Sequence, residues 1–169
     1  MTYCIMINQI SKNVSQLYFK DFGSCVYLLW LKEPVLIDTS SNENEEELLE
    51  NLELLGLDPK EIGAIMLTHT HWDHIGNLHL FKNAKIYSLR NIKEISRNFP
   101  EFKIIETPGH TRDSICILYN DILFSGDTIF ENGYVGRTDL PESDETAMEK
   151  TLEKLKKINY KVLCPGHLV

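Results

Sequence analysis

The chain has 169 residues, a length that suits one compact domain rather than two. Hydrophobic residues make up 43% of it and charged residues 25%, a composition that excludes an intrinsically disordered protein. The net charge is −8, from 25 acidic and 17 basic residues, and this balance disfavours a general nucleic-acid-binding protein.

The amino-terminal residues lack the charged region and the small-residue cleavage site of a signal peptide. The longest apolar run, residues 25–31, is far shorter than a membrane span. We therefore expect a cytoplasmic protein without membrane attachment. Three cysteines lie in apolar runs, where a thiol behaves as a small buried side chain, namely Cys4, Cys25 and Cys116.

The first part of the chain predicts short strands followed by a helix. Four β-type runs come first, over residues 3–10, 16–19, 25–31 and 34–38, and Lys32-Glu33 is predicted to form a tight hairpin connection. The spacing of the next apolar residues predicts an amphipathic helix that ends at Gly56, with Leu48, Leu52 and Leu55 on its buried face. A strand over 62–68, a short helix around 74–81 and a strand over 85–89 are then expected.

The second part of the chain has a similar pattern. A helix over 91–98 and a strand over 103–107 precede a predicted hairpin, whose turn is Asn120-Asp121 and whose strands cover 114–119 and 122–125. A helix with a predicted N-cap at Ser143 follows, and a strand over 161–164 completes the chain. The helix carries an apolar stripe of Met148, Leu152, Leu155 and Ile158. No repeat or linker divides the chain, so one domain over 1–169 is expected, with two packed sheets and helices outside.

The strongest chemical signal is the segment Thr68–His74, which follows a predicted strand and carries three histidines and an aspartate. On extended backbone His69 and His71 project to the same side, and a helix that starts directly afterwards turns Asp73 and His74 toward that side. Imidazole and carboxylate ligands suit zinc, iron or manganese rather than calcium. A polar surface turn does not need this many ligand groups, so the segment predicts a metal site.

Three further loops at predicted strand ends carry the same kinds of side chain. His110 and His167 each follow a Pro-Gly pair, and Asp127 ends a hydrophobic strand. Together with Thr68–His74, these loops offer five histidines and two aspartates, more than one tetrahedral metal ion can use. The set suits two metal ions that share a bridging carboxylate. The sixth histidine, His79, is expected to face solvent and is assigned no ligand position.

In this order, and with the segment Gly136–Leu140 (GRTDL), the motifs resemble those of the metallo-β-lactamase-fold hydrolases. Within that superfamily the chain is most similar to the glyoxalase II (hydroxyacylglutathione hydrolase) branch in its short, single-domain form. The resemblance extends from about Gly23 to His167. It implies an α+β fold, a four-layer αββα metallo-β-lactamase-type sandwich, with the site along one edge of the two sheets.

The resemblance also implies a division of the ligands between two divalent cations, with zinc as the first choice and iron or manganese as alternatives. The first cation would bind His69, His71 and His110, the second Asp73, His74 and His167, and Asp127 would bridge them. Asp38 resembles the supporting aspartate that orients a ligand loop. Arg137 matches a position near the substrate end of the site, with a structural salt bridge as the alternative role.

The residues fit a hydrolytic mechanism. Two divalent ions lower the pKa of a bridging water toward neutrality, so that a metal-bridging hydroxide forms without a separate strong base. One ion also stabilises the oxyanion, and Asp73 is expected to steer the hydroxide. A small-molecule thioester such as S-lactoylglutathione suits this chemistry, because its thiolate leaves without a strong general acid, and a related ester is the alternative. The Gly-x-Ser-x-Gly motif of serine hydrolases is absent from the sequence.

The chain departs from full-length glyoxalase II enzymes after His167. It stops at Val169, so the C-terminal helical domain that contributes much of the glutathione site is expected to be missing. Leu168 stands where the family commonly has a glycine. Nothing in the sequence predicts an oligomeric state.

The main alternative function is that of a persulfide dioxygenase with one iron held by His69, His110 and Asp127. Such enzymes share the Gly-Arg-Thr-Asp motif, although Leu140-Pro141 after it favours the hydrolases. A β-lactamase is disfavoured because that branch normally has Cys or Ser in place of Asp127, and an RNA-processing nuclease because it would be longer and more basic. A metal-binding module without turnover is a remote third alternative, since a closed structural zinc site uses only four ligands.

Overall fold

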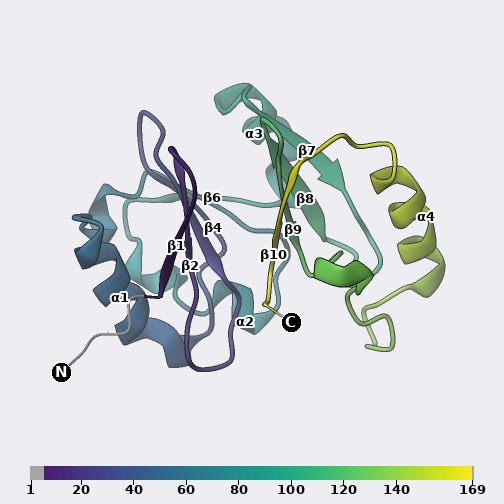
Figure 1. Ribbon diagram of the computed structural model, residues 1–169, viewed down its shortest axis with the longest axis horizontal. Helices are drawn as coiled ribbons and strands as arrows, with labels where there is room; N and C mark the ends of the chain where they lie inside the picture. Colours follow the sequence, from purple (N-terminus) through teal and green to yellow (C-terminus); the bar gives the residue numbers. More distant parts are fainter. Residues whose placement is uncertain (1–5, 169) are drawn as a thin grey trace. The chain divides into compact units, whose positions relative to one another are not determined.

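The computed structural model describes residues 6–168 and divides the chain into two compact units. Unit 1 comprises Met1–Leu67 and His71–Ile86, and unit 2 comprises Thr68–Thr70 and Tyr87–Val169. Each unit contains its own sheet and its own helices (Figure 1). Each unit also has its own hydrophobic cluster. The chain passes from unit 1 into unit 2 and back within the histidine-rich segment that follows Leu67.

The sheet of unit 1 has six strands in the order in which they occur along the chain. Neighbouring strands are antiparallel from the first to the fourth, whereas the fourth and fifth are parallel. A parallel pair needs a crossover connection, and a helix supplies it here. The strands are β1 (Ile7–Ser11), β2 (Val14–Leu17), β3 (Val26–Leu29), β4 (Val35–Ile37), β5 (Ala64–Met66) and β6 (Lys85–Tyr87).

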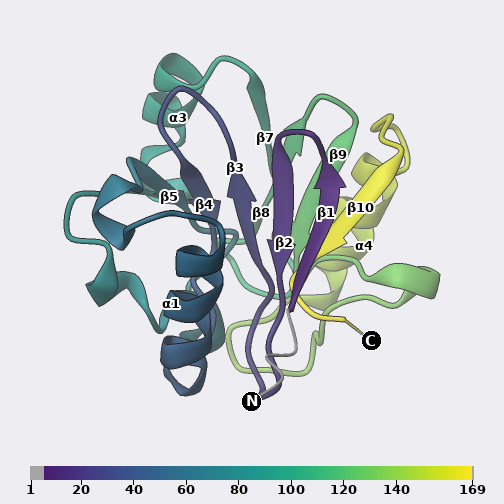
Figure 2. The same ribbon diagram turned by 60° about the vertical axis from the view of Figure 1, so that its left-hand side comes forward.

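The crossover helix, α1 (Glu45–Leu54), packs on the sheet of unit 1 through the predicted apolar stripe. Leu48 and Leu52 are fully buried in one cluster with Leu36 and Ile65 of strands β4 and β5. Figure 2 shows the ribbon of α1 close to that of β4. Acidic residues in the first turn of the helix stabilise its positive N-terminal end. Gly56 ends the helix with a φ of +75°, a conformation that glycine adopts at low cost.

The sheet of unit 2 has four strands in the order β10-β9-β8-β7. Strands β7, β8 and β9 are antiparallel neighbours, and β9 and β10 are parallel. Leu155 of the last helix packs with Cys116 and Leu123, so that this helix covers one face of the sheet. The elements of unit 2 are α3 (Ile92–Asn98), β7 (Phe102–Glu106), β8 (Ile115–Tyr119), β9 (Ile122–Gly126), α4 (Glu145–Leu155) and β10 (Val162–Pro165).

The predicted N-cap of α4 is wrong by one residue. The Asp144 carboxylate, rather than the Ser143 hydroxyl, accepts a hydrogen bond from the Ala147 amide, at 2.9 Å. Ser143 instead donates to the backbone carbonyl of His110, at 2.7 Å. The carboxylate is the better cap because its negative charge also interacts with the helix N-terminus. The helix ends at Leu155, so Ile158 lies beyond it.

The predicted helix around 74–81 is two shorter pieces. One turn of α-helix, α2 (Trp72–Ile75), is followed by a 3-10 turn over Leu78–Leu80. The side chain of Asn77 separates them, because its amide donates to the carbonyls of Thr39 and Ser41 at 2.8 and 2.7 Å. The predicted first strand begins at Ile7, and its expected start and Cys4 lie outside the described residues.

The predicted burial of two of the three cysteines in apolar runs, Cys25 and Cys116, is confirmed. Between residues 6 and 168, no helix has the length and apolar character required to cross a membrane.

Candidate metal centre

Four of the predicted ligands belong to unit 2, and the topology of its sheet explains why three of them meet. His110 follows β7, Asp127 follows β9 and His167 follows β10. Strand β10 is parallel to β9, and β7 points the same way because two antiparallel pairings separate it from β9. The carboxyl ends of these three strands therefore lie at one edge of the sheet. The fourth ligand, His69, reaches this unit through the segment Thr68–Thr70.

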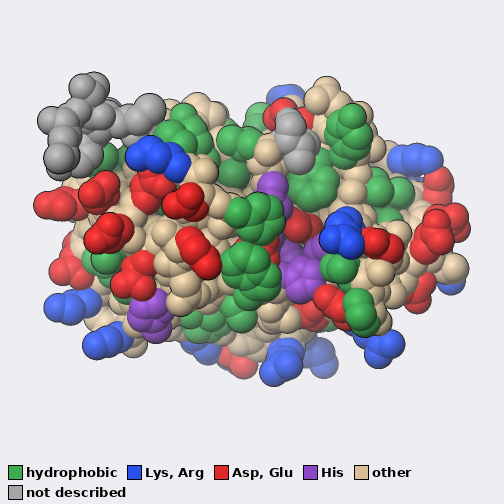
Figure 3. All heavy atoms as spheres, turned by 90° about the horizontal axis from the view of Figure 1, so that it is seen from below, with side chains coloured by type: hydrophobic (Ala, Val, Ile, Leu, Met, Phe, Trp, Pro, Cys, Tyr) green, Lys and Arg blue, Asp and Glu red, His purple; other side chains and the backbone are tan. Residues whose placement is uncertain are grey.

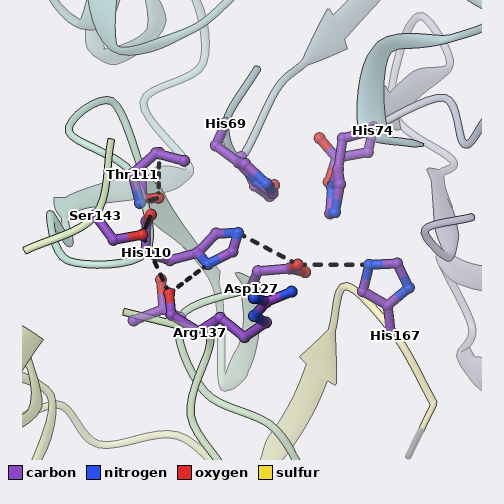
Figure 4. A network of polar contacts seen from close by, with 12 residues as sticks. His69, His74, His110, Thr111, Asp127, Arg137, Ser143 and His167 are labelled. Atoms are coloured by element: carbon purple, nitrogen blue, oxygen red, sulfur yellow. Dashed lines mark hydrogen bonds and ion pairs between the residues drawn. The ribbon is translucent and has the colours of Figure 1, made fainter. Parts of the chain in front are cut away.

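The Asp127 carboxylate lies between two imidazole rings (Figure 4). Its Oδ2 atom is 3.6 Å from Nε2 of His110 and 3.5 Å from Nε2 of His167. The ring of His69 is perpendicular to that of His110, with 5.1 Å between the ring centroids. Imidazole nitrogens and a carboxylate oxygen form the donor set that zinc, iron and manganese accept.

His110 is oriented by the backbone of a distant segment. Its Nδ1 atom donates a hydrogen bond to the carbonyl of Arg137, at 2.9 Å. A carbonyl oxygen only accepts, so Nδ1 carries the proton and Nε2 presents its lone pair toward Asp127. The Ser143 hydroxyl donates to the carbonyl of His110 and also lies 3.4 Å from that of Arg137, which ties the two segments together. Outer hydrogen bonds of this kind fix the tautomer and direction of a metal-binding histidine.

Two glycines allow the backbone around Asp127 to pack closely. Gly126 has a φ of +50°, and a Cβ atom there would lie 2.5 Å from Oγ1 of Thr68. A Cβ atom on Gly136 would lie 1.8 Å from the carbonyl oxygen of Asp127. A larger residue at position 136 would force the backbone of Asp127 to move, and one at position 126 would press on the side chain of Thr68.

The other three predicted ligands, His71, Asp73 and His74, belong to unit 1. His71 is the extended residue before α2, while Asp73 and His74 lie within that helical turn and are buried. The backbone carbonyl of His74 accepts from the amide and hydroxyl of Thr39, at 2.7 and 3.1 Å. The short helix is thereby fixed to the loop that follows β4.

Asp38 lies where the sequence places an orienting carboxylate. Its Oδ2 atom is 2.7 Å from Nδ1 of His74, and both side chains are buried. The bond leaves Nε2 of His74 as the nitrogen directed away from Asp38. Asp38 has a φ of +58°, which is strained for a residue with a side chain. Strain of this kind is concentrated at functional sites, where the surrounding structure maintains it.

The guanidinium of Arg137 is on the surface and makes two parallel bonds to the Asp139 carboxylate, both at 2.9 Å. This hydrogen-bonded pairing raises the pKa of Arg137 and lowers the pKa of Asp139. The salt bridge considered from the sequence is therefore present, with both side chains 69% exposed. His79 is also exposed, and its Nε2 atom lies 3.2 Å from Glu45.

The sequence does not point to the carbonyl of Arg137 or to Ser143 as partners of His110. A backbone carbonyl has no side-chain identity, so no residue pattern could have revealed the first contact. A serine before a helix is commonly its N-cap, so the sequence predicts that the Ser143 hydroxyl bonds to the helix amides rather than to the carbonyl of His110. Histidine side chains are visible at the surface of the face in Figure 3, and acidic side chains are numerous on the same face.

The family model of the metallo-beta-lactamase superfamily matches residues 21–103 and 89–167 of the chain. A protein of Methanocaldococcus jannaschii named "Probable metallo-hydrolase" is 34% identical over 143 residues, which cover 79% of this chain and 70% of that protein. The hydroxyacylglutathione hydrolase of Francisella tularensis subsp. novicida is 30% identical over 152 residues, covering 79% of this chain but only 58% of the relative.

A solved structure, a di-iron-bound form of the protein TTHA1623, has a similar fold, with a TM-score of 0.73 and 24% sequence identity. The match covers 91% of this chain and 92% of that one. These likenesses confirm the α+β, metallo-β-lactamase-type fold expected from the motifs. By its match to the family model and its identity to the metallo-hydrolase, the chain belongs to the metallo-β-lactamase superfamily.

Proposed function

We propose that this protein is a hydrolase that uses two divalent cations to cleave a thioester. The observation that supports this most directly is the position of Asp127. One of its carboxylate oxygens lies 3.6 Å from His110 and 3.5 Å from His167, two imidazoles on different loops. A carboxylate placed between two imidazoles suits a ligand that bridges two metal ions.

In this proposal the histidines and aspartates of both units hold the same pair of cations. Two hydrogen bonds support it. The carbonyl of Arg137 accepts from Nδ1 of His110, and the carboxylate of Asp38 pairs with Nδ1 of His74. Each contact leaves the Nε2 atom of that histidine directed for metal binding. Zinc is the expected metal, and the di-iron form of a similar structure supports iron as an alternative. His69, His71 and His110 would hold the first cation, Asp73, His74 and His167 would hold the second, and Asp127 would be shared between them.

When bound, the two cations supply a water of near-neutral pKa and polarise the substrate carbonyl. The residues of the chain position the reactants. Asp73 orients the attacking water, and Arg137 binds an anionic group of the substrate. The reaction adds water across the thioester, breaks the carbon–sulfur bond and yields a carboxylic acid and a thiol.

The similarity to a hydroxyacylglutathione hydrolase supports a glutathione thioester as the substrate to test first. The chain spans 58% of the length of that relative. The identity of the thiol carrier is therefore part of the proposal.

The test is the hydrolysis of S-lactoylglutathione by protein reconstituted with zinc, iron or manganese, with the bound metal measured in the same samples. We expect two metal ions per chain and metal-dependent turnover. Asp127→Asn should lower both together, because the amide offers one oxygen instead of two. His79→Ala is the matched control and should change neither. Full metal binding and full activity in Asp127→Asn would contradict the bridging role.

A persulfide dioxygenase is the second candidate, and one observation favours it. The three residues that would hold a single iron, His69, His110 and Asp127, all belong to unit 2 and lie close together there. One tightly held iron with oxygen uptake on a persulfide substrate, and without hydrolysis of the thioester, would favour this function over the hydrolase.

A further inference from the structure

Two large aromatic side chains of unit 1 are exposed to solvent and lie against each other. Phe22 is 66% exposed and Trp72 is 58% exposed. Their ring centroids are 5.9 Å apart and the rings are tilted by 39°. An adjacent pair of exposed aromatic rings is a surface that can bind an apolar group. We call these two residues the aromatic pair.

The backbone beneath Phe22 is held firmly. Its carbonyl accepts hydrogen bonds from Oγ of Ser41 at 2.6 Å and from Nδ2 of Asn44 at 3.4 Å. The next residue, Gly23, packs so closely that a Cβ atom there would lie 2.5 Å from Asn44 and from Ser40. The exposed ring of Phe22 therefore projects from an anchored loop.

The same loop is tied to the proposed metal ligands. The amide of Ser24 donates to the backbone carbonyl of Asp73, at 2.9 Å. Trp72 lies between His71 and Asp73 in the chain, and consecutive Cα atoms are about 3.8 Å apart. The backbone that carries the Trp72 ring is thus the same short segment that carries the proposed ligands His71 and Asp73.

We propose that the aromatic pair binds an apolar substituent, aromatic or branched, on the acyl group of the substrate. This inference rests on the thioester hydrolase proposed above. The substituent is attached to the carbonyl carbon that is attacked, so it must lie near the metal ligands. The thiol carrier is attached to the same carbon, but a polar, anionic carrier such as glutathione finds no complementary charge on two aromatic rings. The aromatic pair therefore selects the acyl group.

Two substrates with the same thiol test this. S-lactoylglutathione and S-mandeloylglutathione are both 2-hydroxyacyl thioesters, and they differ in a methyl or a phenyl substituent. Losing an apolar contact of this size costs about tenfold in kcat/KM. We expect Trp72→Ala and Phe22→Ala to lower kcat/KM for the mandeloyl substrate by about this factor, and to change the lactoyl rate by less than about twofold.

Two variants serve as controls. Leu54→Ala removes an apolar side chain of similar exposure, 57%, from helix α1 in the same unit, and should leave both rates unchanged. Trp72→Phe should retain most of the mandeloyl activity, since it keeps an aromatic ring. Metal content is measured for each variant, because Trp72 is adjacent to proposed ligands. An equal fall for both substrates at full metal content, or no change for either, would overturn the inference.

A second measurement does not need turnover. The chain has two tryptophans, so Trp30→Phe leaves Trp72 as the sole tryptophan reporter. We expect mandelate to change its fluorescence at concentrations about tenfold below those of lactate in the zinc-loaded protein. Hydrolysis of neither thioester by the unmodified protein would refute the proposed function, and the titration would then decide separately whether the aromatic pair prefers a phenyl group. Equal responses to the two acids would refute that preference.

Discussion

Nδ1 of His110 donates to the backbone carbonyl of Arg137, at 2.9 Å, while the guanidinium of Arg137 points to Asp139. Arg137 thus has two separate contacts, since its main chain orients a proposed ligand and its side chain, which is proposed to bind an anionic group of the substrate, pairs with Asp139. A substitution that shortens the side chain leaves the carbonyl in place. The two roles can therefore be separated by mutation.

Arg137→Ala should keep the full metal content and raise KM for S-lactoylglutathione by about tenfold, with kcat little changed. The factor follows from the loss of one charge-assisted hydrogen bond to the substrate. Steady-state kinetics together with metal analysis measure both quantities. Arg90→Ala, in a 3-10 turn of unit 2, is the control for the loss of one positive charge. A fall in metal content with unchanged KM would show that Arg137 acts through His110 alone.

Gly136→Ala should weaken metal binding and destabilise the fold by about 1–3 kcal/mol, the usual cost of forcing extra volume into a packed site. The added Cβ atom would lie 1.8 Å from the carbonyl oxygen of Asp127, so the backbone at this proposed ligand must shift. Urea unfolding and metal titration measure the two effects. Gly133→Ala is the matched control, because its φ of +81° strains the backbone but no atom lies within 4 Å of the new Cβ. Equal metal affinities in the two variants would show that the clash with the Asp127 backbone does not weaken metal binding.

Asp38→Asn should reduce the affinity for one of the two metal ions by about 10–100-fold, as is typical for the outer partner of a metal-binding histidine. The amide can still hydrogen-bond to Nδ1 of His74 but lacks the charge that makes the imidazole a stronger ligand. Metal titration distinguishes the two sites if the variant loses the cation proposed to bind His74 at a lower chelator concentration than the other cation. Asp121→Asn removes an exposed partner of Lys161, at 3.1 Å, and should leave both affinities unchanged. Simultaneous loss of both ions in Asp38→Asn would argue against a role specific to His74.

The buried thiol of Cys116 should make the free energy of unfolding depend on pH in the alkaline range. Burial raises the pKa of its thiol from 9.0 to about 11. Because the pKa in the folded state is the higher one, the stabilising contribution is complete below pH 9 and is lost as the pH rises toward 11. The loss amounts to about 3 kcal/mol for a shift of this size.

The test compares the free energy of unfolding of the unmodified protein and of Cys116→Ala from pH 8 to pH 11 under reducing conditions. We expect a shallower decline in the variant, whatever its stability at pH 8. Parallel curves would show that the thiol of Cys116 does not account for the alkaline loss.

The sequence predicts most of the elements because hydrophobic spacing and turn residues are local signals. The stripe of Leu48 and Leu52 and the turn at Asn120-Asp121 are both confirmed. The sequence predicts the wrong cap for α4 because Ser143 and Asp144 are adjacent and both residue types are good caps. Only the contact of Ser143 with the loop of His110 distinguishes them. The helix after His74 was overestimated because the bonds of Asn77 to a distant loop interrupt it.

The candidate ligands were predictable for a different reason, since several histidines at strand ends have few structural uses. Their assignment to two cations, the role of Arg137 and the single-domain organisation over 1–169 remain predictions. The outer contacts of His110 could not be predicted, because the position of the Arg137 carbonyl depends on how residues 136–143 fold back on His110.

The parallel pairing of β9 with β10 also affects how metal binding protects the backbone. Asp127 and His167 follow these two strands, and helix α4 lies between them in the chain. Opening this pair separates Asp127 from His167, and opening the β7–β8 pair likewise separates His110 from Asp127. A bound cation stabilises only conformations that keep its ligands together. Added metal should therefore slow amide hydrogen exchange at both edge strands of this sheet, β10 and β7, although no further strand among residues 6–168 covers either edge.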